Sequence, residues 1–167
     1  WSDHGFHLGE KDHIEKFALW EKATHIPFIV VAPGVTTPGS RCDRPVDMSV
    51  LYPTLLDLCS LPDDPQCDGK SIGPLLRNLD MEWKHPAIMT YGRGNHAARS
   101  QRWRYIRYAD GTEELYDHEN DPHEWNNLAG EAAWDDVIKE HRRWLPRKEA
   151  KQVADLRAPK AKARKLP

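Results

Sequence analysis

Apolar and polar residues alternate in two neighbouring runs of the C-terminal half, residues 102–108 and 114–116. Alternation with a period of two is typical of strands that bury one face. The runs are separated by Ala-Asp-Gly-Thr at residues 109–112, and Asp-Gly favours a tight hairpin turn. The pattern therefore predicts an antiparallel hairpin, and a further strand is expected over residues 87–91.

Upstream, the pattern becomes continuous rather than alternating. Residues 27–34, Pro-Phe-Ile-Val-Val-Ala-Pro-Gly, form a β-branched apolar run bounded by proline and Pro-Gly. Such a run is typical of a strand buried on both faces, so we expect a parallel strand here. Residues 12–24 carry apolar side chains at mixed spacing, which predicts a short irregular helix.

Two segments between these regions have the signals of helices. Residues 47–61 begin with Asp47 or Ser49 as a cap, and Pro53 falls in the first turn, where proline is tolerated. Residues 71–79 are expected to form a second, short helix. The apolar face of the first helix is predicted to hold Leu51, Leu55 and Leu58.

The order of these elements divides the chain into three parts. Residues 1–80 are predicted to form an α/β part, and residues 81–146 a small antiparallel sheet closed by a helix over residues 131–144. The chain opens on Trp-Ser-Asp-His-Gly, a polar stretch of the kind that follows a strand in α/β folds. We therefore expect the N-terminal half of the same fold to lie upstream of Trp1.

Charge is distributed unevenly along the 167 residues. Residues 147–167 hold eight Lys or Arg against Glu149 and Asp155, a net charge of +6, so the rest of the chain, with 16 basic and 24 acidic groups, carries -8. This basic tail lacks aromatic residues and is predicted to be disordered. A basic arm can bind a polyanion, but we favour a solvated terminus and expect no nucleic-acid partner.

Composition excludes further classes of protein. Hydrophobic residues make up 39% of the chain, enough for a core, and no run of 18 apolar residues predicts a membrane span. Cys42, Cys59 and Cys67 lack Cys-x-x-Cys spacing, which argues against a structural zinc site. Cys59 and Cys67 are candidates for a disulfide across the loop between them.

Asp3 and His4 are the first candidates for chemistry. The glycine that follows lets the backbone turn, so the carboxylate and the imidazole can face one point. Two ligands are fewer than a divalent cation needs. Taken alone, Asp-His-Gly is more typical of a turn than of a metal site.

A longer stretch of sequence changes this interpretation. Residues 2–10, Ser-Asp-His-Gly-Phe-His-Leu-Gly-Glu, are followed by Lys16 and by Thr-His-Ile-Pro at residues 24–27. Further motifs are Tyr-Pro-Thr-Leu-Leu-Asp-Leu at 52–58, Asp-Gly-Lys-Ser at 68–71, Glu-Leu-Tyr-Asp at 114–117 and Asp-Pro-x-Glu-x-x-Asn-Leu at 121–128. Over roughly residues 1–146, the set resembles type I sulfatases, with His4 resembling the iduronate-2-sulfatase-like branch. The resemblance implies the C-terminal part of an alkaline-phosphatase-like α/β fold.

The resemblance also implies roles for individual residues. Asp3 and His4 would bind a divalent cation, usually calcium. Lys16 would hold a sulfate oxygen, and His25 would line the same pocket. The ammonium group of Lys16 suits sulfate binding because it offers three donors to a tetrahedral anion and offsets the charge that develops on the leaving group.

The family's nucleophile is a formylglycine made from Cys or Ser in a Cys/Ser-x-Pro/Ala-x-Arg motif, and no such motif occurs in this sequence. Cys42-Asp43-Arg44-Pro45 has Arg and Pro in the wrong order. The nucleophile and a paired Asp-Asp that supplies other metal ligands are expected upstream. The chain alone is therefore expected to be inactive.

A second polar cluster lies in the loop predicted over residues 92–100. Its Arg and His side chains suit a carboxylated or sulfated sugar, so a sulfated sugar or polysaccharide is the expected substrate, although a plain surface connection is the alternative. Trp103, Trp125 and Trp144 are interpreted as packing residues. The family resemblance implies an exported protein, periplasmic or extracellular, or a lysosome-like location. The candidate sugar-binding residues are Arg93, Asn95, His96 and Arg99.

Two other functions stay open. A phosphonate monoester hydrolase or phosphodiesterase of the same superfamily also has Asp-His-Gly and a downstream lysine. A non-catalytic carbohydrate-binding or structural module would bind glycan without turnover. The residues upstream of Trp1 would distinguish these alternatives.

Overall fold

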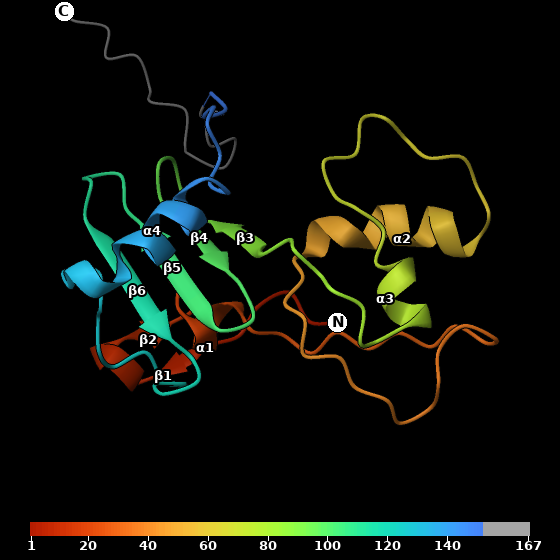
Figure 1. Cartoon of the computed structure of the whole chain (residues 1–167), viewed down its shortest axis with the longest axis horizontal. Helices are drawn as coiled ribbons and strands as arrows, with labels where there is room; N and C mark the ends of the chain where they lie inside the picture. The colour runs from red at the N-terminus through yellow and green to blue at the C-terminus, as the bar shows by residue number, and fades with distance from the viewer. Residues whose placement is uncertain (152–167) are drawn as a thin grey trace, which may run out of the picture.

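Four consecutive strands form an antiparallel sheet in the order β3-β4-β5-β6. In the computed structural model, which describes residues 1–151, the sheet lies beside a separate pair of helices, α2 and α3 (Figure 1). The strands are β3 Ala87–Thr90, β4 His96–Arg99, β5 Trp103–Arg107 and β6 Glu113–Asp117. The helices are α1 Glu21–Thr24, α2 Leu51–Leu58, α3 Gly73–Arg77 and α4 Asp135–Arg142.

The predicted hairpin is confirmed as β5 and β6, with Trp103 opposite Asp117 and Arg107 opposite Glu113. Its turn is closed by the Tyr108 amide, which donates to the Thr112 carbonyl at 2.9 Å. Gly111 adopts φ 88°, a conformation that glycine takes without a steric penalty. The strand predicted over residues 87–91 is also present as β3.

The loop predicted over residues 92–100 is wrong for its second half. Residues 96–99 form β4, which pairs with β3 on one side and β5 on the other. Ala97 and Ala98 are fully buried, because the sheet is covered on both faces. Strands are predicted from an alternation of large apolar and polar residues, and His-Ala-Ala-Arg does not have that alternation.

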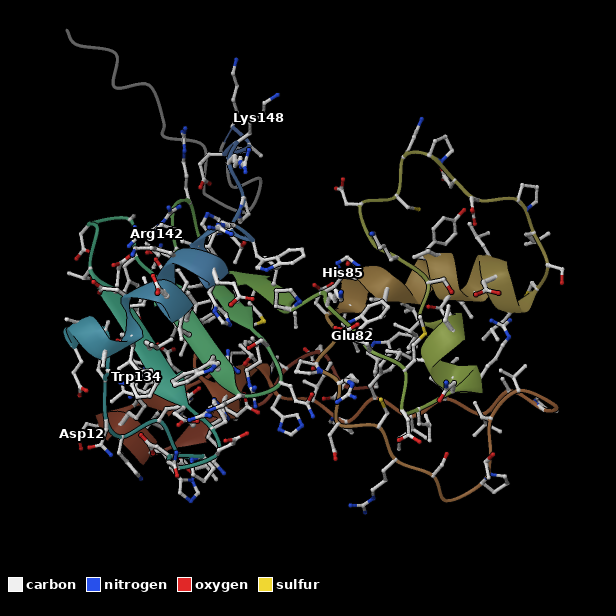
Figure 2. The ribbon with its side chains drawn as sticks, viewed as in Figure 1. Asp12, Glu82, His85, Trp134, Arg142 and Lys148 are labelled. Atoms are coloured by element: carbon white, nitrogen blue, oxygen red, sulfur yellow. The ribbon has the colours of Figure 1, made fainter. Side chains whose placement is uncertain are left out.

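Alternate residues of the sheet contribute to two different cores. Ala98, Tyr105 and Leu115 face α4, where Ile138 and Leu145 complete a buried cluster. The helix predicted over residues 131–144 is thus confirmed as α4, preceded by a 3-10 turn at Ala132–Trp134. Figure 2 shows Trp134 and Arg142 from this helical region, and the Trp134 ring lies 4.9 Å from that of Trp103.

The opposite face of the sheet is covered by the N-terminal segment of the chain. Leu19 packs there with Ala97, Ile106 and Tyr116. Burying a side chain such as Ile106 contributes about 1.5–3 kcal/mol, so this contact fastens a distant segment to the sheet. The helix expected over residues 12–24 is wrong: only α1 is helical, because the chain first forms a short hairpin.

That hairpin consists of β1 His7–Leu8 and β2 Ile14–Glu15, joined through a 3-10 turn at Glu10–Asp12. Lys11 and Asp12 have φ of 56° and 55°, in the left-handed region. A regular helix cannot pass through consecutive residues in that conformation.

The parallel strand predicted over residues 27–34 is also wrong, because no strand within residues 1–151 pairs with it. Ile29 and Val31 are 78% and 84% exposed, whereas Phe28 packs against the α2–α3 cluster. The segment is apolar but has no neighbour in the described residues that could supply ladder hydrogen bonds.

The predicted capping by Asp47 is confirmed, since its carboxylate accepts from the Ser49 amide at 3.0 Å and so caps the 3-10 turn Met48–Val50, which continues directly into α2. The second predicted helix is present as α3. The predicted apolar face is wrong: Leu55 is 50% exposed, and the core is formed instead by Val50, Ile72 and Leu75.

Thr54 links the two helices, because its hydroxyl donates to the Val50 carbonyl at 2.6 Å and accepts from the Ile72 amide at 3.0 Å. The candidate disulfide is not formed. Cys59 is exposed at the end of α2, and Cys67 lies in a turn where its amide donates to the Asp64 carbonyl.

Residues 152–167, most of the predicted tail, lie outside the described residues. Packing was not expected from about residue 149 onward, yet Glu149 contacts His96 at 2.6 Å because a buried imidazole needs a polar partner. Lys148, in contrast, extends away from the sheet (Figure 2). Among the described residues, no helix has both the length and the apolar character needed to span a bilayer.

Candidate functional site

Asp3, His4 and Lys16 come together at the N-terminal end of the described chain. The Lys16 ammonium lies 3.0 Å from His4 Nε2, and the Asp3 carboxylate lies 3.3 Å from the same nitrogen. The Asp3 side chain is 84% exposed and that of His4 34% exposed. The predicted proximity of the three groups is therefore observed.

The short hairpin explains why these residues meet. Pairing of His7 with Glu15 and of Leu8 with Ile14 returns the chain to the level of His4. That Asp3 and His4 follow a strand lying upstream of Trp1 stays a prediction, and the two strands between them and Lys16 are antiparallel. The two-stranded ladder needs only a local turn, whereas a parallel pair needs a long crossover.

Gly5 holds the first part of the site against α1. Its amide donates to the Ala23 carbonyl at 2.8 Å, and a side chain at this position would collide with the Lys22 carbonyl. The Asp-His-Gly motif therefore needs glycine for a close backbone approach.

The hydrogen bonds of His4 define its tautomer. Nδ1 lies 2.6 Å from the Gly5 carbonyl oxygen, which can only accept, so Nδ1 carries the proton and Nε2 has the lone pair. A histidine oriented by a backbone carbonyl in this way is typical of metal ligands. His4 Nε2 and an oxygen of the Asp3 carboxylate are 3.3 Å apart, close enough for one cation to contact both atoms.

His25, predicted to line the same pocket, lies at the end of α1 with a 75% exposed side chain. Its Nδ1 is 3.3 Å from the Glu21 carboxylate. Within residues 1–151, no hydrogen bond or ion pair joins His25 to Asp3, His4 or Lys16. Its role in the pocket stays a prediction.

The four predicted sugar-binding residues are divided between the two ends of β4. His96 is buried, with Nδ1 at 2.8 Å from the Thr90 hydroxyl and Nε2 on Glu149. Asn95 accepts from the Ala109 amide at 3.0 Å, and Arg93 lines an open pocket of about 470 Å³.

Arg99, at the other end of β4, lies 3.3 Å from the Glu21 carboxylate. The four residues therefore do not form one cluster.

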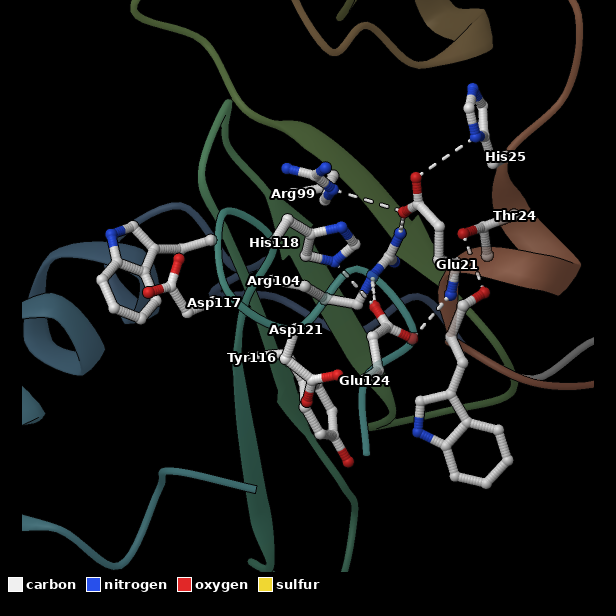
Figure 3. A network of polar contacts seen from close by, with 12 residues as sticks. Glu21, Thr24, His25, Arg99, Arg104, Tyr116, Asp117, His118, Asp121 and Glu124 are labelled. Atoms are coloured by element: carbon white, nitrogen blue, oxygen red, sulfur yellow. Dashed lines mark hydrogen bonds and ion pairs between the residues drawn. The ribbon is translucent and has the colours of Figure 1, made fainter. Parts of the chain in front are cut away.

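A buried polar network that the sequence interpretation missed joins α1 to the sheet (Figure 3). Arg104, which is 1% exposed, pairs with the Glu21 carboxylate and lies 2.5 Å from that of Glu124. His118 lies 3.0 Å from Glu124, whose other oxygen accepts from the Glu21 amide at 2.8 Å.

Electrostatics keep both acids of this network ionised. Burial alone raises the pKa of Glu21, but the charges of Arg104 and Arg99 outweigh burial and lower that pKa to about 2. Burial likewise opposes ionisation of Glu124, yet the hydrogen bond from His118 and the charge of Arg104 lower its pKa.

Glu21, His118 and Glu124 are close enough for a cation, but the guanidinium groups of Arg104 and Arg99 already neutralise the carboxylates. The network therefore fastens α1 to the sheet. One signal was available in the sequence: Arg104 is two residues before Ile106 in an alternating run, and so faces the same buried side.

A family described as "N-sulphoglucosamine sulphohydrolase, C-terminal" matches residues 9–151. A sulfatase of Formosa agariphila is 41% identical over 150 residues, which cover 90% of this chain and 29% of that protein. A Delta 4,5-hexuronate-2-O-sulfatase of Bacteroides thetaiotaomicron is 28% identical, with coverage of 86% and 32%, and agrees loosely with the iduronate-2-sulfatase-like branch. The chain thus spans less than a third of the length of these relatives.

Solved structures have the same fold. One, a protein in complex with its substrate D-glucosamine-2-N,6-O-disulfate, has a TM-score of 0.71 at 26% identity and is matched over 85% of this chain and 31% of that chain. The phosphonate monoester hydrolase of Agrobacterium radiobacter has a TM-score of 0.69 at 25% identity, with coverage of 85% and 32%. The mixed α/β architecture with small antiparallel sheets is therefore that of the C-terminal part of an alkaline-phosphatase-like fold.

Proposed function

Because the chain belongs to the sulfatases, as the C-terminal part of that fold, we propose that it completes an enzyme that hydrolyses sulfate esters of sugars or polysaccharides. The observation that carries this proposal is the meeting of Asp3, His4 and Lys16 on one exposed surface. The sulfated glucosamine bound by one structural relative supports the substrate class.

Lys16 has the chemistry to hold the sulfate group. Its ammonium lies 3.0 Å from His4 Nε2, which has the one lone pair of that side chain. A cation bound at Nε2 would take that lone pair, and all three donors of the ammonium would then be available to anion oxygens next to the cation. A positioned cation stabilises the negative charge that develops as a sulfate ester breaks.

Asp3 and His4 would hold a divalent cation, for which we propose calcium. Their donor atoms have the spacing of adjacent ligands, and the carboxylate is open to solvent. When bound, such a cation supplies positive charge next to the sulfate oxygens. We expect the remaining ligands and the formylglycine nucleophile in a part of the enzyme upstream of Trp1.

A phosphonate monoester or phosphodiester is the alternative substrate, favoured by the structural likeness to the Agrobacterium hydrolase. Both substrate classes present anionic oxygens that a lysine can bind. Thermal unfolding of the chain in sodium sulfate or in phenylphosphonate, each with and without calcium, would rank the two anions. We expect the larger rise in Tm with sulfate.

The test of the proposal uses Lys16→Ala and Asp3→Asn. Because a ligand that binds only the folded state raises Tm, sulfate should raise the Tm of the parent chain more than that of Lys16→Ala, which keeps only the general stabilisation by sulfate, and calcium should not stabilise Asp3→Asn. Lys139→Ala, which removes an exposed lysine on α4, is the matched control and should respond like the parent. An equal response of Lys16→Ala and the parent to sulfate would contradict the proposal.

The chain by itself should not turn over an aryl sulfate, since positioning of an attacking oxygen supplies much of the rate in such reactions. Turnover of p-nitrophenyl sulfate that Lys16→Ala abolishes would mean that a nucleophile lies within these 167 residues.

A further inference from the structure

Two exposed aromatic rings lie beside the candidate sulfate-binding lysine. Phe17 and Tyr91 stack with ring centroids 5.6 Å apart and an angle of 23° between the ring planes. Phe17 is 51% exposed and Tyr91 49% exposed, so the stack leaves about half of each residue open. The two rings form a contiguous exposed apolar patch, and such patches can mark ligand-binding surfaces.

The rings come from segments far apart in the chain. Phe17 directly follows Lys16 after the short N-terminal hairpin. Tyr91 follows β3, and its amide donates to the Asn95 carbonyl at 3.1 Å, which closes a loop containing two glycines with positive φ. Each ring is therefore positioned by its own backbone, and the stack is the point at which the site segment meets the loop.

Distances relate the rings to the anion site. The Lys16 ammonium lies 5.5 Å from the centre of the Phe17 ring and 3.0 Å from His4. A sulfate on this ammonium with its ester oxygen directed toward Phe17 would bring the sugar that carries it against the aromatic pair. The face of an aromatic ring is negative, and the C–H groups on the face of a pyranose are weakly positive, so the two surfaces attract each other.

We propose that Phe17 and Tyr91 form a stacking surface for the pyranose ring whose sulfate is held by Lys16. The inference rests on the proposed function and adds a contact that recognises the sugar ring of the substrate. The lysine recognises the anion, and the aromatic pair recognises the sugar that bears it.

The experiment compares two ligands of equal charge, glucose 6-sulfate and ethyl sulfate, which differ in the sugar ring. Dissociation constants of the 167-residue chain for both are measured by NMR titration in calcium-containing buffer. A stacking contact predicts about fivefold tighter binding of glucose 6-sulfate. Phe17→Ala should reduce this preference to about one without changing the affinity for ethyl sulfate, and Tyr91→Ala should reduce it in part.

Two further variants separate stacking from folding. Phe17→Leu keeps an apolar side chain without an aromatic face and should lose the preference, whereas Phe17→Trp should keep it. Trp125→Ala removes an exposed aromatic residue in a different loop and is the matched control, expected to behave like the parent.

The outcomes distinguish the inference from the proposed function. If Lys16→Ala weakens the binding of both ligands but the parent chain binds the two with equal affinity, the stacking surface is refuted and the anion site stands. If Phe17→Leu keeps the full preference, the inference is also wrong. If neither ligand binds, or Lys16→Ala changes neither affinity, the proposed function fails with it.

Discussion

The sheet and the α2–α3 pair differ in how completely they bury their own apolar residues. The sheet is covered on both faces, and Tyr105, Ile106 and Leu115 are fully buried. The helical pair has a small core of Val50, Ile72 and Leu75 and is approached by a segment whose Ile29 and Val31 face solvent. Most of the stability should therefore come from the sheet, whereas the helical pair presents surface suited to other parts of the fold.

The strongest test of this difference is to break one ion pair in each region. Arg104→Ala removes the guanidinium that Glu21 and Glu124 share and leaves them with Arg99 and His118, so it should lower the free energy of unfolding by about 3 kcal/mol. Arg77→Ala removes the partner of Asp57, which lies 2.9 Å away, and should cost a small fraction of that amount because the Arg77 side chain is half exposed. Urea unfolding at pH 7, followed by circular dichroism, measures both. Similar losses would mean that the two regions contribute equally.

Lowering the pH should also reduce the stability of the sheet region, by less than Arg104→Ala does. The pKa of Glu21 is about 2 in the folded chain against an ordinary 4.5, so its stabilising contribution is present above about pH 4.5 and is lost as pH falls toward 2. The free energy of unfolding should fall by an amount on the order of 2 kcal/mol between pH 6 and 3. Urea midpoints between pH 6 and 3, for example, should fall less steeply in Glu21→Gln.

Asp57→Asn is the control for this measurement. A hydrogen bond from Arg77 also lowers the pKa of Asp57, but the Arg77 side chain is 49% exposed and solvent screens the pair, so its removal should change the pH dependence little. A pH profile that Glu21→Gln leaves unchanged would show that other carboxylates cause the acid sensitivity.

The smallest effect on stability is expected from the exposed apolar segment. Ile29→Ser with Val31→Ser should change the free energy of unfolding by less than about 0.5 kcal/mol, because both side chains already face solvent. The same double variant should self-associate less in light-scattering measurements. A destabilisation above about 1 kcal/mol would mean that the segment is buried in solution.

Local patterns predicted the parts of the fold that local physics determines. The hairpin of β5 and β6 followed from alternation and an Asp-Gly turn, and the Asp47 cap from its position before an apolar run. Strand β4 was missed, because Ala97 and Ala98 owe their burial to covering layers that a window of sequence does not contain. The strand predicted over residues 27–34 was wrong for the opposite reason. An apolar run indicates that the segment would be stabilised by neighbouring strands, but it does not show that such strands are there.

The residues of the candidate site also differ in whether local sequence predicted them. The meeting of Asp3, His4 and Lys16 was predictable from family motifs within a short stretch. The network of Glu21, Arg104 and Glu124 was not, because its members are spread over about a hundred residues and are joined only by the packing of α1 on the sheet.

The bond from the Glu21 amide to Glu124 spans 103 residues, and that from Lys11 to Tyr116 spans 105. On a ribosome, the segment that contains Lys16 emerges long before either partner has been synthesised. The local β1–β2 hairpin can already bring Lys16 to His4, but the segment cannot pack on the sheet until the β5–β6 hairpin exists, because such long-range contacts form only after a large loop has closed. The anion binding that we propose for this segment would therefore be complete only after the last strand of the sheet has docked.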